Sequence, residues 1–133
     1  MVERQGTDGS KFVVLYHASP LVIHWDILIR VGHAPELLAW RCLIDPSAWF
    51  LNATDFNTVV TQLHNHRLKY LDFTGPISGG RGWVTPVIHL DAQVIWQSST
   101  ALEIRASGCN PPLKMALRNV SADKWSLYAT CHQ

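Results

Sequence analysis

The chain has 133 residues, of which 47% are hydrophobic and 16% are charged. This length and composition predict one globular domain with a core of its own, and they exclude an intrinsically disordered protein. The formal net charge of +1 excludes a strongly basic protein that coats nucleic acid through dozens of phosphate contacts, although it is compatible with a local basic patch.

The predicted organisation is a flexible N-terminus over residues 1–11 followed by a single domain over residues 12–133. The polar N-terminus lacks the apolar core of a signal peptide, and no segment reaches the roughly 18 apolar residues that a membrane span requires. The cysteines, Cys42, Cys109 and Cys131, are irregularly spaced and form no disulfide framework. We therefore expect a soluble, cytoplasmic protein with no membrane partner.

The first predicted elements are three strands. Residues 11–17, 21–31 and 37–44 are rich in β-branched and aromatic side chains, and short polar connections join them. This pattern predicts a three-stranded meander.

The pattern changes between residues 52 and 66, where we predict a helix of about three turns. Asn52 or Thr54 can cap its N-terminus, and the apolar residues recur at helical spacing. These apolar residues are Phe56, Val59, Val60 and Leu63.

The remainder of the chain is predicted to be short strands. A strand over residues 69–73 precedes a glycine-rich turn, and polar or Gly/Pro turns then separate the later strands. These later strands cover residues 83–90, 92–99, 101–107, 113–120 and 124–130. Short strands at regular spacing predict a mainly β fold, a small closed antiparallel β-barrel of about eight strands with one short helix.

The polar residues that best fit a functional site lie at the first strand connection. Alternation along the second strand places His24 and Asp26 on the same side, about 6.6 Å apart along the strand. His17 ends the preceding strand, and the connection is short enough to return the chain beside it. Imidazoles and a carboxylate can bind Mn²⁺, Fe²⁺ or Zn²⁺, whereas a hydrogen-bonded His–Asp pair beneath a loop is the structural alternative.

The order of motifs resembles a known family. The chain contains F-V-V-L-Y-H ending at His17, H-W-D over residues 24–26, a strand with Trp40, H-R-L-K-Y over residues 66–70, and G-G-R-G over residues 79–82. Over the span from about residue 12 to residue 130, this order and spacing resemble the 3′-phosphoesterase domain of bacterial DNA ligase D and its small stand-alone relatives.

The resemblance implies a hydrolase of DNA repair by non-homologous end joining. It assigns Mn²⁺, or Zn²⁺ or another divalent ion, to His17, Asp26 and His66, and it gives His24 and Tyr70 a catalytic role at the phosphate. The implied reaction removes a 3′-phosphate or a 3′-terminal ribonucleotide from DNA or RNA 3′ ends. The implied partners are separate end-joining ligases or polymerases.

The chain departs from the family at two arginines that contact phosphate, because Leu28 and Thr58 stand at those positions. We expect Arg30 and Arg81 to bind the substrate in their place, and Arg41 is a further candidate. Two alternatives remain open, the first because of the missing arginines and the second because of the near-zero net charge. One is a noncatalytic module of the same fold that binds nucleic-acid ends or a repair partner, and the other is an enzyme for a different small phosphate ester.

Overall fold

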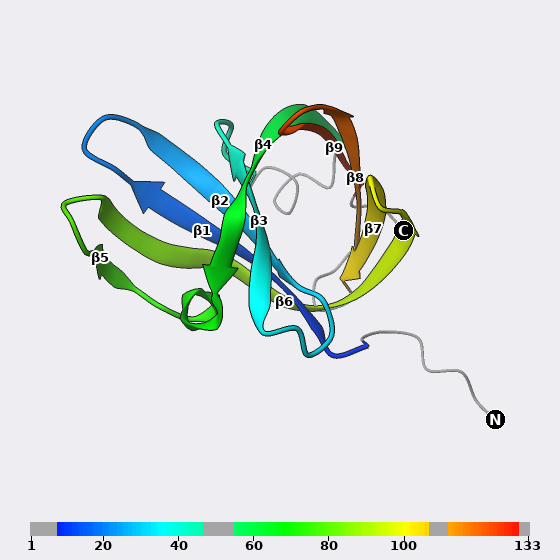
Figure 1. Ribbon diagram of the computed structural model, residues 1–133, viewed down its shortest axis with the longest axis horizontal. Helices are drawn as coiled ribbons and strands as arrows, with labels where there is room; N and C mark the ends of the chain where they lie inside the picture. The colour runs from blue at the N-terminus through cyan, green and yellow to red at the C-terminus, as the bar shows by residue number, and fades with distance from the viewer. Residues whose placement is uncertain (1–7, 47–54, 107–111, 131–133) are drawn as a thin grey trace.

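The computed structural model describes residues 8–46, 55–106 and 112–130. Their nine antiparallel strands form one sheet in the order β1-β2-β3-β4-β9-β8-β7-β6-β5, and β1 also pairs with β6 (Figure 1). Eight strands therefore close into a barrel, and β5 is an extra strand beside β6. The strands are β1 (Ser10–Ala18), β2 (Ile23–Arg30), β3 (Glu36–Cys42), β4 (Phe56–Arg67), β5 (Gly75–Ile77), β6 (Gly82–Ser98), β7 (Ala101–Ala106), β8 (Leu113–Ser121) and β9 (Lys124–Thr130). The predicted closed β-barrel is confirmed, as is the meander formed by β1, β2 and β3.

The predicted helix is wrong within the described residues, because β4 occupies Phe56–Arg67. Residues 58–61 are four consecutive β-branched side chains, which favour extended backbone and disfavour a helix. Strand β4 also closes the sheet, because it pairs with β3 on one side and with β9 on the other. Without it the barrel would be open. The capping positions, Asn52 and Thr54, lie outside the described residues.

Two further strand predictions are corrected. The segment predicted as a strand over residues 69–73 contains a single 3₁₀ turn, η1 (Leu68–Leu71), whose residues Leu68 and Leu71 can share one side because they are three positions apart. The predicted strands over residues 83–90 and 92–99 are one continuous strand, β6. Asp91 does not interrupt it, because its side chain points outward and pairs with Lys11.

Two apolar cores flank the wall of the barrel. The larger core takes residues from all eight barrel strands and therefore fills the interior. The second core lies on the outer face of β1, β2 and β3 and includes Val13, Leu15, Leu28, Leu37 and Ala39. The chain that runs from the end of β4 through η1 to β5 supplies the apolar side chains that cover it. The outer face of β1, β2 and β3 and this covering segment together enclose a space on one side of the barrel.

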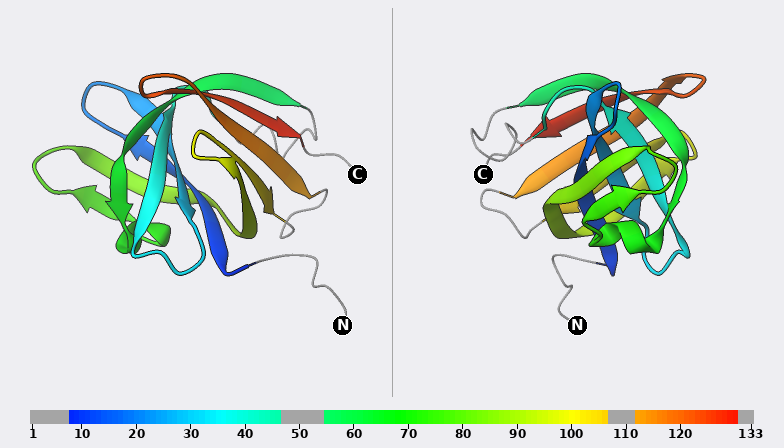
Figure 2. Two further views of the ribbon diagram at one scale, coloured as in Figure 1. Left: turned by 45° about the vertical axis from the view of Figure 1, so that its right-hand side comes forward. Right: turned by 90° about the vertical axis from the view of Figure 1, so that its left-hand side faces the viewer.

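The β1–β2 and β5–β6 hairpins project together from one side of the barrel (Figures 1 and 2). Pairing between β1 and β6 holds them side by side as far as Ala18 and Trp83. The candidate site lies beside the turn of the β1–β2 hairpin and the turn between β5 and β6. Among the described residues, no helix has the length and apolar character needed to cross a membrane.

Candidate metal centre and its cleft

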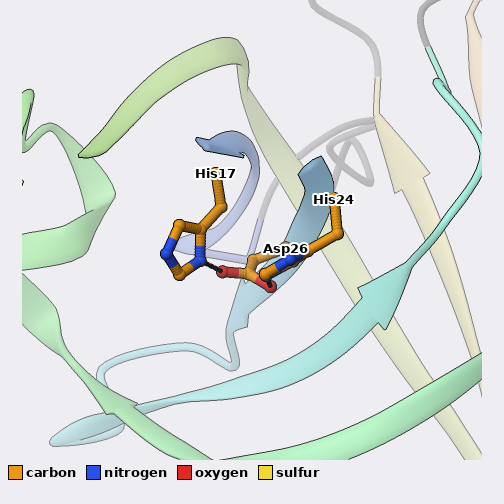
Figure 3. Close-up of side chains that lie close together, drawn as sticks. All are labelled: His17, His24 and Asp26. Atoms are coloured by element: carbon orange, nitrogen blue, oxygen red, sulfur yellow. Dashed lines mark hydrogen bonds and ion pairs between the residues drawn. The ribbon is translucent and has the colours of Figure 1, made fainter. Parts of the chain in front are cut away.

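The site is centred on the β1–β2 hairpin, next to its turn. His17 of β1 lies directly opposite His24 of β2, and Asp26 follows two residues later on the same face. The Nδ1 atom of His17 is 3.3 Å from Oδ2 of Asp26, and Nε2 of His24 is 3.2 Å from Oδ1 (Figure 3). One ligand atom from each side chain lies within 4.8 Å of the others. The antiparallel register therefore brings His17, His24 and Asp26 together as the sequence predicted.

The polar atoms of this set are buried without full hydrogen bonding. The side chain of His24 is only 2% exposed, and neither of its ring nitrogens has a hydrogen-bond partner in the described structure. The Oδ1 atom of Asp26 is also buried without one, because the nearby His24 nitrogen does not approach it in hydrogen-bonding geometry. Buried polar atoms without partners cost roughly 1–3 kcal/mol each. A bound cation would satisfy the carboxylate oxygen and an imidazole nitrogen together.

The orientation of His17 is fixed from a distant part of the chain. Its Nε2 atom donates to the backbone carbonyl of Arg81, at 2.9 Å. A carbonyl oxygen only accepts, so Nε2 carries a proton and Nδ1 faces Asp26. Metal-bound histidines typically donate their other ring nitrogen in this way. The donor set of two imidazoles and one carboxylate thus fits Mn²⁺, Fe²⁺ or Zn²⁺.

Electrostatics favours the metal-binding form of Asp26. Burial raises the pKa of this carboxyl, but the hydrogen bond from His17, the proximity of His24 and the positive charges of both bring the pKa down to about 2. The hydrogen bond to Asp26 raises the pKa of His17, while burial and the charge of Arg41 oppose that rise. Asp26 is therefore a carboxylate at neutral pH.

A cleft of about 870 Å³ opens over this set. The outer face of β1, β2 and β3 forms its floor, where His17, His24 and Asp26 lie. Strand β4, η1, the β5–β6 turn and the β8–β9 turn supply its other lining residues. The set is therefore accessible to a ligand although two of its three side chains are buried.

A β-bulge in β4 directs His66 into the cleft. Opposite β3, Ala39 pairs with Leu63 and Leu37 pairs with His66, so two residues of β4 stand opposite the single Leu38. Regular alternation from Leu63 would turn His66 to the other face, and the extra residue restores it to the cleft face. Bulges of this kind commonly re-aim a side chain next to a functional site.

His66 and Tyr70 pack together on the side of the cleft that β4 and η1 form. Their rings make an edge-to-face contact with centroids 5.9 Å apart, and both line the cleft. The Nδ1 atom of His66 donates to the carbonyl of His64 at 2.9 Å, which leaves the lone pair on Nε2. Within the described ranges, the compact ligand group contains His24 and does not contain His66. The assignment of His66 as a metal ligand stays a prediction.

The two predicted substrate arginines have different positions. Arg30 lies four residues beyond Asp26 on β2, donates to the carbonyl of Ala34 at 2.9 Å, and is not among the residues that line the cleft. Arg81 lines the cleft, but its guanidinium is bound to the backbone and side chain of Ser78. Its carbonyl, which holds His17, is the part that contacts the set.

Arg41, the further candidate from the sequence, lines the cleft, and so does Arg67, which the sequence did not single out. Arg41 stands directly opposite Asp26 in the β2–β3 pairing. This register, which the sequence of either strand alone does not give, places Arg41 beside the metal set. Leu28, in contrast, is fully buried in the outer core and is unable to contact a ligand.

No protein-family model matches this chain, and no curated protein matches it. The resemblance to the ligase D phosphoesterase domain therefore stays an expectation from the sequence motifs alone.

Proposed function

We propose that this chain is a metal-dependent phosphoesterase that acts on the 3′ ends of DNA or RNA and removes a 3′-phosphate or a 3′-terminal ribonucleotide. Its biological setting would be the repair of DNA ends, alongside separate ligases or polymerases. The observation that carries the proposal is the set of His17, His24 and Asp26 at the floor of an open cleft, with buried polar atoms that lack partners.

The residues divide the work as follows. His17 through Nδ1 and Asp26 through its carboxylate would hold the ion, and His24 completes the compact set. A divalent ion bound there would polarise a phosphate oxygen and lower the pKa of a bound water. The carbonyl of Arg81 keeps the Nε2 proton of His17 in place, so that Nδ1, which faces Asp26, would be the nitrogen that binds the ion. His66 and Tyr70 line the same cleft, and the Nε2 lone pair of His66 would serve as a further ligand.

A noncatalytic module of the same fold is the second candidate, and the burial of Leu28 favours it. This residue stands where the resembled family has a phosphate-binding arginine, and here it belongs to the outer core. Losing a charge-assisted contact of that kind costs roughly 1.5–3 kcal/mol, which is one to two powers of ten in rate if the contact forms in the transition state.

The test is to incubate the protein with primer–templates that end in a 3′-phosphate, a 3′-ribonucleotide or a 3′-hydroxyl, and to measure primer mass before and after. We expect Mn²⁺ to support loss of the phosphate or the ribonucleoside. EDTA and the isosteric variant Asp26→Asn serve as controls, because the amide keeps the shape of the side chain and removes its charge.

A parent protein that matches both controls on every 3′ end contradicts the proposed reaction. Retained binding of the ends in that case identifies the noncatalytic module. Hydrolysis of small phosphate esters without hydrolysis of the primers identifies the third alternative. His66→Ala is measured in parallel by Mn²⁺ calorimetry: we expect a loss of affinity of about tenfold or more, and unchanged affinity would restrict the ligands to the compact set.

A further inference from the structure

A row of polar residues crosses the outside of the barrel next to the candidate metal set. The strand registers place Asp26 opposite Arg41, Arg41 opposite Thr61, and Thr61 opposite Lys124. Residues directly opposite each other share a face, and neighbouring strands are about 4.8 Å apart. The row therefore begins at the metal set and places the Lys124 backbone roughly 14 Å from that of Asp26.

Arg41 is the member of the row closest to the set. Its side chain is exposed and lines the cleft. In the part of the chain that the structure describes, its guanidinium makes no hydrogen bond and no ion pair, even with the neighbouring Asp26. A guanidinium that has no partner and lies beside a carboxylate-containing metal set can bind an anion without first breaking a contact.

Lys124 continues the row on β9. Its ammonium donates to Oγ1 of Thr61 at 2.8 Å, and Thr61 itself lines the cleft. Asp123 is also a lining residue, and its carboxylate lies 4.0 Å from the same ammonium. Because half of the Lys124 side chain is exposed, this weak surface ion pair leaves the ammonium available to a second anion.

We propose that Arg41, Thr61 and Lys124 form a phosphate track that binds the single strand leading to the reacting 3′ end. The reacting phosphate lies over the metal set, the preceding phosphodiester contacts Arg41, and the next one contacts Thr61 and Lys124. The track deepens the proposed function and rests on it. It also supplies the phosphate contacts that Leu28 and Thr58 do not.

Because the whole chain is nearly neutral, the position of Arg41 and Lys124 beside the cleft bears on how a nucleic acid would bind. With a formal net charge of only +1, the surface as a whole gives little attraction for a polyanion. Cations that bind nucleic acid must then be local and few, and each should appear in the salt dependence of binding. The number of phosphates contacted is therefore a measurable property of this site.

The experiment measures binding of a 5′-fluorescent oligothymidylate with a 3′-phosphate by anisotropy over a series of NaCl concentrations, in EDTA so that no hydrolysis occurs. We expect Arg41→Ala and Lys124→Ala each to lower the affinity roughly tenfold. Each variant should also reduce the slope of log affinity against log salt by about 0.7, the value for one single-strand phosphate contact.

The matched control is Arg105→Ala, which removes the same charge from β7. Arg105 is ion-paired with Glu103 at 2.7 Å and is not among the lining residues of the cleft. We expect its slope to equal that of the parent. Arg41→Lys should recover part of the affinity lost in Arg41→Ala, and Asp123→Asn should bind more tightly than the parent.

Equal slopes for the parent, Arg41→Ala and Lys124→Ala would overturn the track, as would a parent that does not bind the oligonucleotide. Hydrolysis of thymidine 3′-phosphate in Mn²⁺ separates this result from the proposed reaction, because that substrate has no second phosphate to reach the track. Hydrolysis without salt-dependent binding would contradict the phosphate track and leave the proposed reaction standing. Binding through the track without hydrolysis would contradict the proposed reaction and leave the phosphate track standing.

Discussion

His24 has the environment least like that of an ordinary core side chain. It is buried on the floor of a cleft, and neither ring nitrogen has a hydrogen-bond partner within the described structure. Proteins rarely retain such groups, because each costs on the order of 1–3 kcal/mol. A cost of this kind is expected where function, rather than stability, determines the residue.

Replacing His24 by leucine should therefore separate stability from metal binding. His24→Leu removes two buried ring nitrogens without hydrogen-bond partners but also the 3.2 Å ion pair between Nε2 and Asp26, and it keeps much of the side-chain volume. The two effects oppose each other, so the free energy of unfolding without metal should change by less than about 1 kcal/mol. Mn²⁺ affinity should fall at least about tenfold. Urea unfolding and calorimetry measure the two quantities.

His64→Leu is the comparison for this variant, because His64 is an exposed histidine that lines the same cleft. It should leave Mn²⁺ affinity unchanged, and the His64 carbonyl that holds His66 is retained. Strong destabilisation of His24→Leu, with Mn²⁺ affinity intact, would show that His24 is a structural residue.

The pH dependence of metal binding follows from His17. In the metal-free protein the hydrogen bond to Asp26 raises the pKa of His17, so its Nδ1 stays protonated to a higher pH than in an ordinary histidine. Metal binding requires that proton to leave. Mn²⁺ affinity should therefore fall as the pH decreases through this raised pKa, and calorimetry between about pH 5 and pH 8 measures the fall. Affinity independent of pH would exclude Nδ1 of His17 as a ligand.

At the scale of elements, the junction of the two projecting hairpins determines where His17 points. Gly82 has a φ of +107°, and a Cβ atom at this position would lie 2.1 Å from the carbonyl oxygen of Ala18. The close approach of the backbones brings the Arg81 carbonyl to His17. Only glycine permits this approach.

Gly82→Ala should consequently damage both stability and the site. A positive φ alone costs an alanine roughly 1–2 kcal/mol, and the clash with Ala18 adds to that cost, so we expect a loss of more than about 2 kcal/mol in unfolding free energy. Mn²⁺ affinity should fall as well, because the Arg81 carbonyl is displaced. Gly80→Ala is the control, since Gly80 also has a positive φ but has no atom within 4 Å of its added Cβ. Equal losses in the two variants would contradict the argument from the clash.

The elements that could be predicted from the sequence are those with strong local patterns. The first three strands combine β-branched residues with short connections, and their pairing was predicted correctly. In β4 the helical spacing of four apolar residues predicts a helix, whereas the run of β-branched residues at 58–61 favours the strand that forms. The need for a strand between β3 and β9 is a property of the closed sheet, which no local window contains.

In the candidate site, too, residues that are close in sequence could be predicted together, and residues from distant strands could not. His17, His24 and Asp26 lie on one hairpin, so alternation and a short turn were enough to bring them together. Arg30 shares their face by alternation, yet it lies at the far end of β2 and binds Ala34. Arg41 enters the cleft through the register between β2 and β3, and His66 through a bulge, and neither feature has a clear sequence signal.

At the scale of the whole molecule, stability depends on the barrel interior, which is separate from the cleft. Trp40 is fully buried there and makes an edge-to-face contact with Trp125, with ring centroids 5.5 Å apart. Trp40→Ala should lower the free energy of unfolding by about 3–5 kcal/mol through loss of packing and the remaining cavity. Trp96→Ala, at a tryptophan that is 45% exposed, should cost much less. Comparable costs in urea unfolding would contradict the position of the interior core.

The two contacts of His17 also join parts of the chain that meet at different stages of folding. Its partner Asp26 is 9 residues away, whereas the Arg81 carbonyl is 64 residues away. Hairpins form in roughly 1–10 μs, and pairings between distant strands follow more slowly. We therefore expect the nascent hairpin to present all three ligands before β6 docks and the barrel closes. A divalent ion present during refolding would then meet a ligand set before the structure that shelters it exists, and refolding rates with and without Mn²⁺ measure whether it guides that closure.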